Sequence, residues 1–330
     1  MTLLPLHLEP VHVEKPWGGF RLSRTPRNAH PDSRIGERWL VADLALDETA
    51  VPDPCSTVRT GPYRGNKLAE LVEVAASELL GLAASHGGRF PLLVKVLDAR
   101  EDLSVQVHPT NEYAAHRPGC NSKTESWLVL SARPGAVLYL GVKHGVSIDD
   151  VRRAAGTPEL VGMLRQVPAR PGSLHHLPSG LIHALGAGVT VLEVQTPSDT
   201  TFRLYDWTRE YERQPRPLHI AEALEIVGSA WGLNVDPRRS QHRSVSEGGL
   251  LLETASYQIF RHQLHVGGHL AVAPGQAKVL YVIDGRVAGD NFTWPIRDGE
   301  VILLPACWQG RAIAEVWSQV IEVRVGPARA

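Results

Sequence analysis

Apolar and polar residues alternate strictly in one short segment of the chain, residues 103–108. Successive side chains of a β-strand point to opposite faces, so Val105 and Val107 are expected on one face. The opposite face then carries three polar side chains, Ser104, Gln106 and His108. A row of this kind occurs on solvated strand faces and also in binding sites, and the segment alone does not distinguish the two.

The same pattern predicts short strands over most of the chain and helices in three places. Turns rich in glycine and proline separate the strands. Expected strands include 11–19, 35–41, 90–97, 126–130, a hairpin within 171–186, and 189–195. Apolar residues recur at the helical period of 3.6 in the segments 66–85, 147–167 and 217–228. The chain is therefore predicted to be mainly β, with a few helices inserted or flanking.

A single charge, Lys95, interrupts the apolar segment 90–97. Burying an unpaired lysine is costly. Either the ammonium group reaches water beyond a covered stem, or the side chain lies in a wet polar cavity. The sequence favours neither interpretation.

One spacing pattern occurs twice and indicates an internal repeat. In each copy a proline lies six residues after a glycine, and the residue to be compared between the copies lies eleven residues after the same glycine. An apolar strand with one glutamate follows. The copies are Gly172, Pro178, His183 and Glu193, and Gly299, Pro305, Gly310 and Glu322. A looser match of 126–133 with 279–286 makes Lys278 the equivalent of Glu125 in the second copy. We interpret the repeat as two β-barrels of one design, of which only the first could hold a metal ion.

This repeat suggests how the chain divides into domains. A metal-binding domain with helical insertions is expected at 1–233, and a degenerate second barrel at 249–330. The segment 234–248 between them is polar and rich in arginine and serine, which is typical of a linker.

Composition and charge exclude several classes of protein. The 330 residues carry a formal net charge of −1, so no overall basic field favours nucleic acid or an anionic membrane. Any attraction for an anionic ligand must then be local. The three cysteines are scattered, without the spacing of a zinc motif or a disulfide framework. No signal peptide is visible and no apolar run approaches the roughly 20 residues of a membrane helix, so a cytoplasmic location is expected.

Polar side chains of the first predicted barrel combine into a candidate metal site. Imidazole, carboxylate and amide donors together suit zinc or a similar divalent ion. The chain offers these donors on three strands, as Gln106, His108, Glu125 and His183. A lone histidine in a strand is more often a hydrogen-bonded core residue, so these residues alone leave both interpretations open.

Several longer motifs follow one another in the chain. Gln-Val-His-Pro comes after Phe-Pro-Leu-Leu-Val-Lys, and Lys-Thr-Glu follows. Pro-Ser-Gly-Leu-Ile-His-Ala-Leu-Gly-Ala-Gly and Ser-Asp-Thr-Thr-Phe-Arg-Leu-Tyr-Asp come later. Together with Lys-Pro-Trp-Gly-Gly at 15–19, these motifs resemble the shorter bacterial form of type I mannose-6-phosphate isomerase. The resemblance extends to about residue 210, and the C-terminal third fits less specifically.

The resemblance implies a cupin (jelly-roll) fold with two β-barrels and one zinc ion per chain. The implied zinc ligands are Gln106, His108, Glu125 and His183. Five further residues fall on positions that the family uses around the substrate: Ser104, Lys95, Lys123, Asp199 and Arg203. The chain departs from the family at 36–40, where Gly-Glu-Arg-Trp-Leu stands in place of the expected Gly-Glu-Ser-Trp-Glu.

The implied reaction interconverts mannose 6-phosphate and fructose 6-phosphate through a cis-enediol. Negative charge that develops on O1 and O2 would be stabilised by the divalent ion and by Arg203. Ser104 and Lys123 are candidates for binding the substrate phosphate, with Arg203 as the alternative. The reaction also needs a base near the C2 hydrogen, and Lys123 or Asp199 could serve.

Two other functions are compatible with the same residues. Two histidines and one carboxylate also form the facial triad of Fe(II) oxygenases. The fourth candidate ligand, Gln106, and the surrounding cations argue against that class. The second alternative is a cupin that binds a sugar phosphate without converting it.

Overall fold

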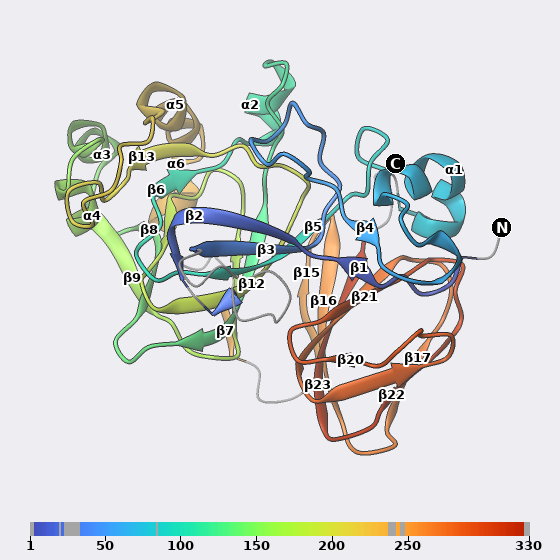
Figure 1. The fold of residues 1–330 in the computed structure, drawn as a ribbon. Helices are drawn as coiled ribbons and strands as arrows, with labels where there is room; N and C mark the ends of the chain where they lie inside the picture. The colour runs from blue at the N-terminus through green and yellow to red at the C-terminus, as the bar shows by residue number, and fades with distance from the viewer. Residues whose placement is uncertain are drawn as a thin grey trace.

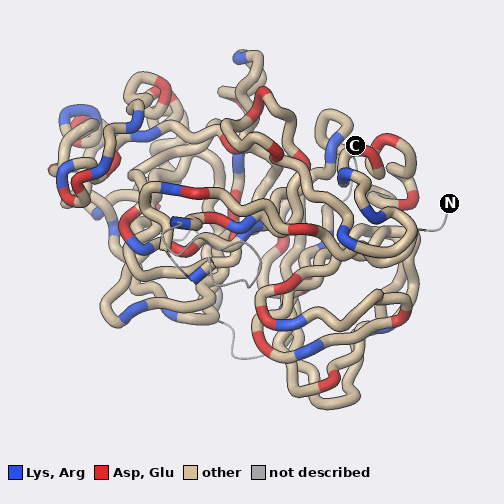
Figure 2. The backbone as a smooth tube through the Cα atoms, in the orientation of Figure 1, with Lys and Arg blue, Asp and Glu red and all other residues tan. Residues whose placement is uncertain are grey.

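The computed structural model describes residues 3–19, 21–22, 34–83, 85–236, 242–244 and 248–326. This part of the chain is mainly β, as the sequence pattern predicts, and forms two units of unequal size (Figure 1). Within these residues no helix is long and apolar enough to cross a bilayer. Basic and acidic positions are interspersed along both units (Figure 2).

The first unit consists of two antiparallel sheets that face each other. The larger sheet has the strand order β14 (His242–Ser244), β10 (Ser173–Leu177), β7 (Glu125–Ala132), β12 (Val189–Gln195), β5 (Leu93–Asp98), β3 (Ile35–Val41), β2 (Val11–Gly19). The smaller sheet has the order β13 (Phe202–Tyr205), β6 (Val105–Val107), β11 (His183–Leu185), β8 (Val137–Val142), β9 (Leu164–Pro168). Side chains of both sheets, such as Trp127 and Leu140, share one apolar cluster between them.

The second unit also consists of two facing sheets. One has the order β15 (Gly249–Glu253), β16 (Tyr257–Leu264), β23 (Ser318–Val325), β18 (Lys278–Asp284), β21 (Val301–Leu304). The other has the order β17 (His269–Val272), β22 (Gly310–Ala314), β19 (Arg286–Gly289), β20 (Ile296–Arg297). Leu280 and Ala312, one from each sheet, belong to the apolar cluster between them.

The two units share a strand order. The run β10-β7-β12-β5 corresponds to β21-β18-β23-β16, and β6-β11-β8-β9 corresponds to β17-β22-β19-β20. Cross-strand register places Lys278 at the position of Glu125 and Gly310 at the position of His183, as the sequence repeat predicts. Pairing among the described strands closes neither unit into a barrel, so the two-barrel interpretation stays a prediction.

The central strands β5 and β12 of the larger sheet are buried on both faces, because the second unit covers the outer side of the sheet. Val94 of β5 and Val323 of β23 belong to one apolar cluster, which helix α1 (Leu68–Leu80) also joins. Leu97, on the other face of β5, packs inside the first unit. A strand buried on both faces needs apolar residues without alternation, which explains the segment 90–97. Lys95 shares the inward face with Leu97.

Helices occur in all three segments predicted to be helical, but they are shorter. Besides α1 they are α3 (Ile148–Ala154), α4 (Glu159–Met163) and α5 (Ile220–Ser229). The predicted helix to residue 167 ends early because residues 164–168 pair with β8 as strand β9. Helices α2 (Asn111–Ala115) and α6 (Trp231–Val235), a 3-10 helix (Gly61–Tyr63) and the pair β1 (Leu8–Glu9) and β4 (Thr57–Val58) were not predicted. Elements of two to five residues are too short to show a periodicity.

The predicted linker at 234–248 contains strand β14. That strand pairs with β10 of the first unit, so part of the predicted linker extends the larger sheet. Residues 237–241 and 245–247 lie outside the described residues. The domain boundaries themselves stay a prediction.

Candidate metal centre

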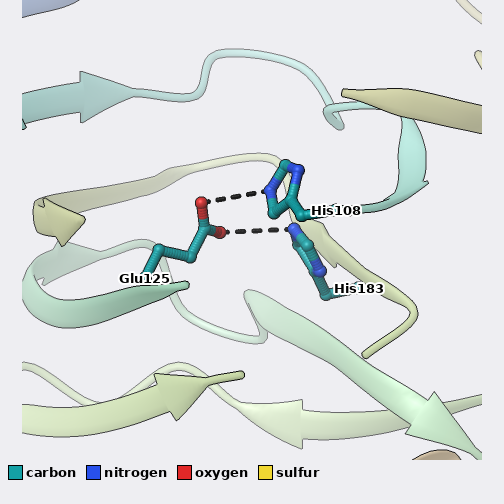
Figure 3. Close-up of side chains that lie close together, drawn as sticks. All are labelled: His108, Glu125 and His183. Carbon is teal, nitrogen blue, oxygen red and sulfur yellow. Dashed lines mark ion pairs between the residues drawn. The ribbon is translucent and has the colours of Figure 1, made fainter. Parts of the chain in front are cut away.

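Three side chains from separate strands converge inside the first unit. His108 follows β6, Glu125 begins β7 and His183 begins β11 (Figure 3). Nε2 of His108 lies 3.1 Å from Oε2 of Glu125, and Nε2 of His183 lies 3.2 Å from Oε1 of the same carboxylate. Each of the three side chains is at most 2% exposed. The alternating pattern around residue 106 therefore marks an interior polar face.

These buried polar atoms are poorly satisfied by the protein itself. Nε2 of His108 and both carboxylate oxygens of Glu125 lack a hydrogen bond of acceptable geometry among the described residues. Burial, reinforced by the charge of Lys123, lowers the pKa of His108 to about 3, so its ring is neutral. Burial opposes ionisation of Glu125, but its neighbours, the positive charge of Lys123 first among them, hold the pKa of that carboxyl well below its usual range.

The backbone orients both imidazole rings. Nδ1 of His108 donates to the carbonyl oxygen of Thr200 at 3.1 Å, and Nδ1 of His183 donates to that of Leu181 at 2.8 Å. A carbonyl oxygen only accepts, so each Nδ1 carries the proton and each Nε2 keeps its lone pair for the centre. Metal-binding histidines are commonly fixed in this way.

The arrangement fits a divalent ion. Ligand atoms bound at about 2.0–2.2 Å in a tetrahedral site stand roughly 3.3–3.5 Å apart. The two separations around Glu125 are close to this, and the candidate ligand atoms of all three residues lie within 4.8 Å of one another. Two imidazoles, an ionised carboxylate and unsatisfied buried atoms together describe a site that could hold zinc or a similar ion.

Gln106, the fourth predicted ligand, lies beside this triad. Its Nε2 is 3.3 Å from Nε2 of His183, and its Oε1 accepts a hydrogen bond from Oγ of Ser104 at 3.0 Å. Rotation of the amide by 180° about its terminal bond would present the oxygen to the centre instead. Gln106 and His183 are cross-strand partners of β6 and β11, which explains why they meet.

A cavity of about 90 Å³ adjoins the triad. Gln106 and Lys123, which contact the triad, both line it. All five residues predicted to surround the substrate are in its wall: Lys95, Ser104, Lys123, Asp199 and Arg203. Further lining comes from side chains that the sequence did not single out: Lys15, Trp17, Glu37, Trp127, Glu193, Thr201 and Arg216 among others.

Six side chains of alternating charge form a row that follows this wall and ends at Glu125 of the triad. The strand order β2-β3-β5-β12-β7 of the larger sheet places them side by side. The row runs Lys15, Glu37, Lys95, Glu193, Lys123 and Glu125, with successive N–O distances of 3.1, 3.3, 3.4, 3.8 and 2.9 Å. Each buried lysine thus has a carboxylate on both sides, which offsets the cost of removing its charge from water.

The pairing accounts for the ionisation of the row. Burial alone would lower the pKa of Lys95, but Glu193 and Glu37 raise it above its ordinary value. Lys15 and Lys95 outweigh burial and lower the pKa of Glu37. Glu193 behaves differently, because burial and the nearby charge of Glu125 raise its pKa despite two lysines. Lys95 is 3% exposed and lines the cavity, so its ammonium group does not lie in open solvent.

Arg203 is the cation of the cavity wall that lacks an ion pair among the described residues. It lies on β13 opposite Gln106 of β6. Its Nε is buried and has no hydrogen-bond partner in this part of the chain, whereas Arg216 beside it forms a two-pronged ion pair with Asp206. Burial and the charge of Arg216 lower the pKa of the Arg203 guanidinium. Asp199 accepts a hydrogen bond from Thr49 at 2.7 Å.

Sequence reasoning missed the carboxylates Glu37 and Glu193 as members of the site. The available signal was the same as for Lys95, a charge inside an apolar strand. Glu193 had been noted only as part of the repeat. Its place between two lysines follows from strand order, which the hydrophobic pattern does not reveal.

Comparison with known proteins gives concordant matches. The sequence model of the type I phosphomannose isomerase catalytic domain matches residues 6–126. Mannose-6-phosphate isomerase ManA of Bacillus subtilis is 34% identical over 315 residues, which cover 92% of this chain and 94% of that protein. A mannose-6-phosphate isomerase of Streptococcus mutans is 32% identical over 303 residues, covering 91% of this chain and 92% of that protein.

Solved structures show the same fold. The crystal structure of the mannose 6-phosphate isomerase from Bacillus subtilis matches with a TM-score of 0.77 and 28% identity, covering 97% of this chain and 99% of that one. A zinc-bound mannose 6-phosphate isomerase matches with a TM-score of 0.70 at 17% identity, covering 98% of this chain and 100% of that one.

Proposed function

The chain belongs to the mannose-6-phosphate isomerase family, and from this we propose that it interconverts mannose 6-phosphate and fructose 6-phosphate in the cavity beside the buried triad. One observation carries the proposal. A buried His, Glu and His set with unsatisfied ligand atoms adjoins a cavity lined by lysines and by an arginine that has no ion pair among the described residues, in a chain of this family.

The resident ion in this proposal is zinc, held by His108, Glu125 and His183, with the amide oxygen of Gln106 as a fourth ligand. Two neutral imidazoles with one carboxylate are an ordinary zinc set. When bound, the ion supplies positive charge to the oxygens on which the enediol charge develops. In the structure the amide oxygen accepts from the Ser104 hydroxyl at 3.0 Å, so this role requires the amide to turn by 180°; Oγ of Ser104 then accepts from the amide nitrogen.

Arg203 is the residue we assign to an anionic group of the substrate. Lys95 and Lys123 are each flanked by carboxylates, whereas the Arg203 guanidinium has no ion pair among the described residues. A guanidinium is suited to phosphate or to an enediolate oxygen, because its parallel N–H groups match either. Ser104, Lys95 and Lys123 complete the substrate-binding set.

The proton transfer needs a group whose pKa is close to neutrality. Lys123 and Asp199 were the candidates from the sequence. Glu193 is a third, because it lines the cavity and burial raises its pKa. We assign to Glu193 the removal of the C2 proton and its return to C1. Lys123 and Asp199 line the same cavity.

The finer description of the fold belongs to the same proposal. The shared strand order of the two units is consistent with two cupin-type barrels, at 1–233 and 249–330 with a linker at 234–248. The predicted cytoplasmic location rests on the sequence.

A coupled isomerase assay tests the function. Purified protein should convert mannose 6-phosphate to fructose 6-phosphate, lose activity after chelation, and regain it with zinc. Free mannose, which lacks the phosphate, should react far more slowly. Binding of mannose 6-phosphate without conversion would favour the non-catalytic alternative, and oxygen uptake with iron would favour the oxygenase.

A further inference from the structure

Gln195 is a buried amide beside the candidate metal centre that the proposed function does not use. It ends strand β12, is fully buried, and is the cross-strand partner of Glu125. Its side chain lies on the same face of β12 as Glu193, because the two residues are two apart. Its amide nitrogen donates to the carbonyl oxygens of Thr196 at 3.0 Å and Ser198 at 2.6 Å.

The amide of Gln195 holds residues 196–200, and this segment contacts the candidate metal ligand His108. Oγ of Ser198 accepts a hydrogen bond from the backbone nitrogen of Thr200 at 3.2 Å and donates to the carbonyl of Asn121 at 3.0 Å. The carbonyl of Thr200 in turn accepts the Nδ1 proton of His108. Gln195 is thereby linked to His108 through Ser198 and Thr200.

We infer that Gln195 is a positioning residue, whose amide N–H groups hold residues 196–200 so that the Thr200 carbonyl fixes the tautomer of His108. The inference rests on the proposed function only in taking His108 as a metal ligand. Two carbonyl oxygens near one side chain require a group with two donors. A glutamine supplies them, whereas an ionised glutamate of the same shape has none.

Loss of the Gln195 hydrogen bonds affects His108 indirectly, through the position of residues 196–200. A displaced Thr200 carbonyl lets the proton move to Nε2, and a ring protonated there has no lone pair for an ion. Removal of partners that orient metal ligands typically weakens metal affinity about 10- to 100-fold. We expect a loss in this range for Gln195→Met and for Gln195→Glu alike.

The matched control is Gln276→Met in the second unit. Gln276 also donates from Nε2 to a backbone carbonyl, that of Val325 at 3.2 Å, far from the candidate centre in the sequence and in the other unit. This variant removes the same type of contact, so it should retain wild-type zinc affinity. If Gln195→Met does not fold, Ser198→Ala breaks the same chain of contacts without altering strand β12.

Two measurements on folded protein test the inference. Zinc affinity is measured by competition with a chelator, and the histidine side-chain ¹H–¹⁵N spectrum of the metal-free protein reports which ring nitrogen of His108 carries the proton. The expected result is weakened affinity and partial Nε2 protonation in both Gln195 variants, with Gln276→Met unchanged. Affinity and spectrum equal to those of the control would overturn the inference. If the wild type bound no zinc, the proposed function would fail, while the metal-free spectrum would still decide the role of Gln195.

Discussion

The two units of the molecule have the same strand order but differ at the positions that face their interiors. Where the first unit has Gln106 opposite His183, the second has Val272 opposite Gly310. Where the first has Glu125 opposite Gln195, the second has Lys278 opposite Arg324. Among the described residues, one sheet arrangement therefore carries a metal-compatible donor set in one copy and none in the other. The chemistry depends on the side chains placed on the fold, not on the fold itself.

The glutamate common to both units shows the same contrast. Glu193 lies between two lysines beside the cavity, and its pKa is raised. Glu322 is also buried, but His262 contacts it at 2.8 Å and Arg324 donates to it at 2.6 Å. These partners outweigh burial and lower the pKa of Glu322. The Glu322 carboxylate, ionised and paired with His262 and Arg324, has a structural role. The raised pKa of Glu193 suits that carboxylate to proton transfer.

The largest expected effect comes from the pair Glu125 and Lys278. Glu125→Gln should abolish zinc binding and lower kcat/KM by at least about 100-fold, because it removes the charged ligand. Lys278→Gln changes the equivalent position of the second unit and should leave both unchanged. Metal content and the coupled assay measure the outcome. Equal losses in the two variants would contradict the distinction between the units.

The pair Glu193 and Glu322 tests the assignment of proton transfer. Glu193→Gln should retain zinc but lower kcat by about 10²- to 10⁴-fold, because an amide cannot accept the C2 proton. Glu322→Gln should retain kcat and lower the melting temperature, since it breaks a buried ion pair. Steady-state kinetics and thermal unfolding separate these effects. Full kcat in Glu193→Gln would remove it as the base.

Arg203 sharpens the comparison because its strand, β13, has no counterpart among the described strands of the second unit. Arg203→Ala should retain zinc while kcat/KM falls by roughly 10²-fold, because the substitution removes the guanidinium that contacts the substrate anion in the proposed complex. Zinc content, KM and kcat are measured together. Near-normal kinetics would exclude the role assigned to this residue.

The smallest effect concerns the contact between the units. His7 lies next to Leu6, which pairs with Leu303, and its ring centroid is 4.7 Å from that of Trp294. Burial and the charge of Arg59 lower the pKa of His7 to about 4. The unfolded chain takes up this proton as pH falls below about 6.5 while the folded chain does not, so stability decreases between about pH 6.5 and 4.

Replacement of His7 should therefore weaken the acid sensitivity of the protein. The free energy of unfolding of His7→Gln should fall by roughly 2 kcal/mol less than that of the wild type between pH 7 and pH 5. Denaturant titrations at the two pH values measure this difference. An identical fall in both proteins would show that His7 does not contribute.

The sequence predicts the three side chains that converge in the candidate metal centre, and less of its surroundings. The alternation placed His108 on a polar strand face without showing whether that face points inward, and the repeated spacing set His183 against Gly310 of the second copy. The family resemblance, not the pattern, implied that both are metal ligands. Lys95 was ambiguous, since a charge within an apolar run fits a snorkelling side chain as well as a cavity. Glu193 and Gln195 could not be assigned, because their roles depend on which strands are neighbours. The end of α4 was missed because pairing with β8 overrides the helical pattern after Met163.

A crystal structure of the zinc-loaded protein with anomalous data at the zinc edge tests the central claim most directly. The account predicts a single peak per chain, within bonding distance of Nε2 of His108, Nε2 of His183 and the carboxylate of Glu125. It predicts no peak between the sheets of the second unit. A fully loaded crystal whose peak lies elsewhere, or whose second unit binds the ion equally, would contradict it.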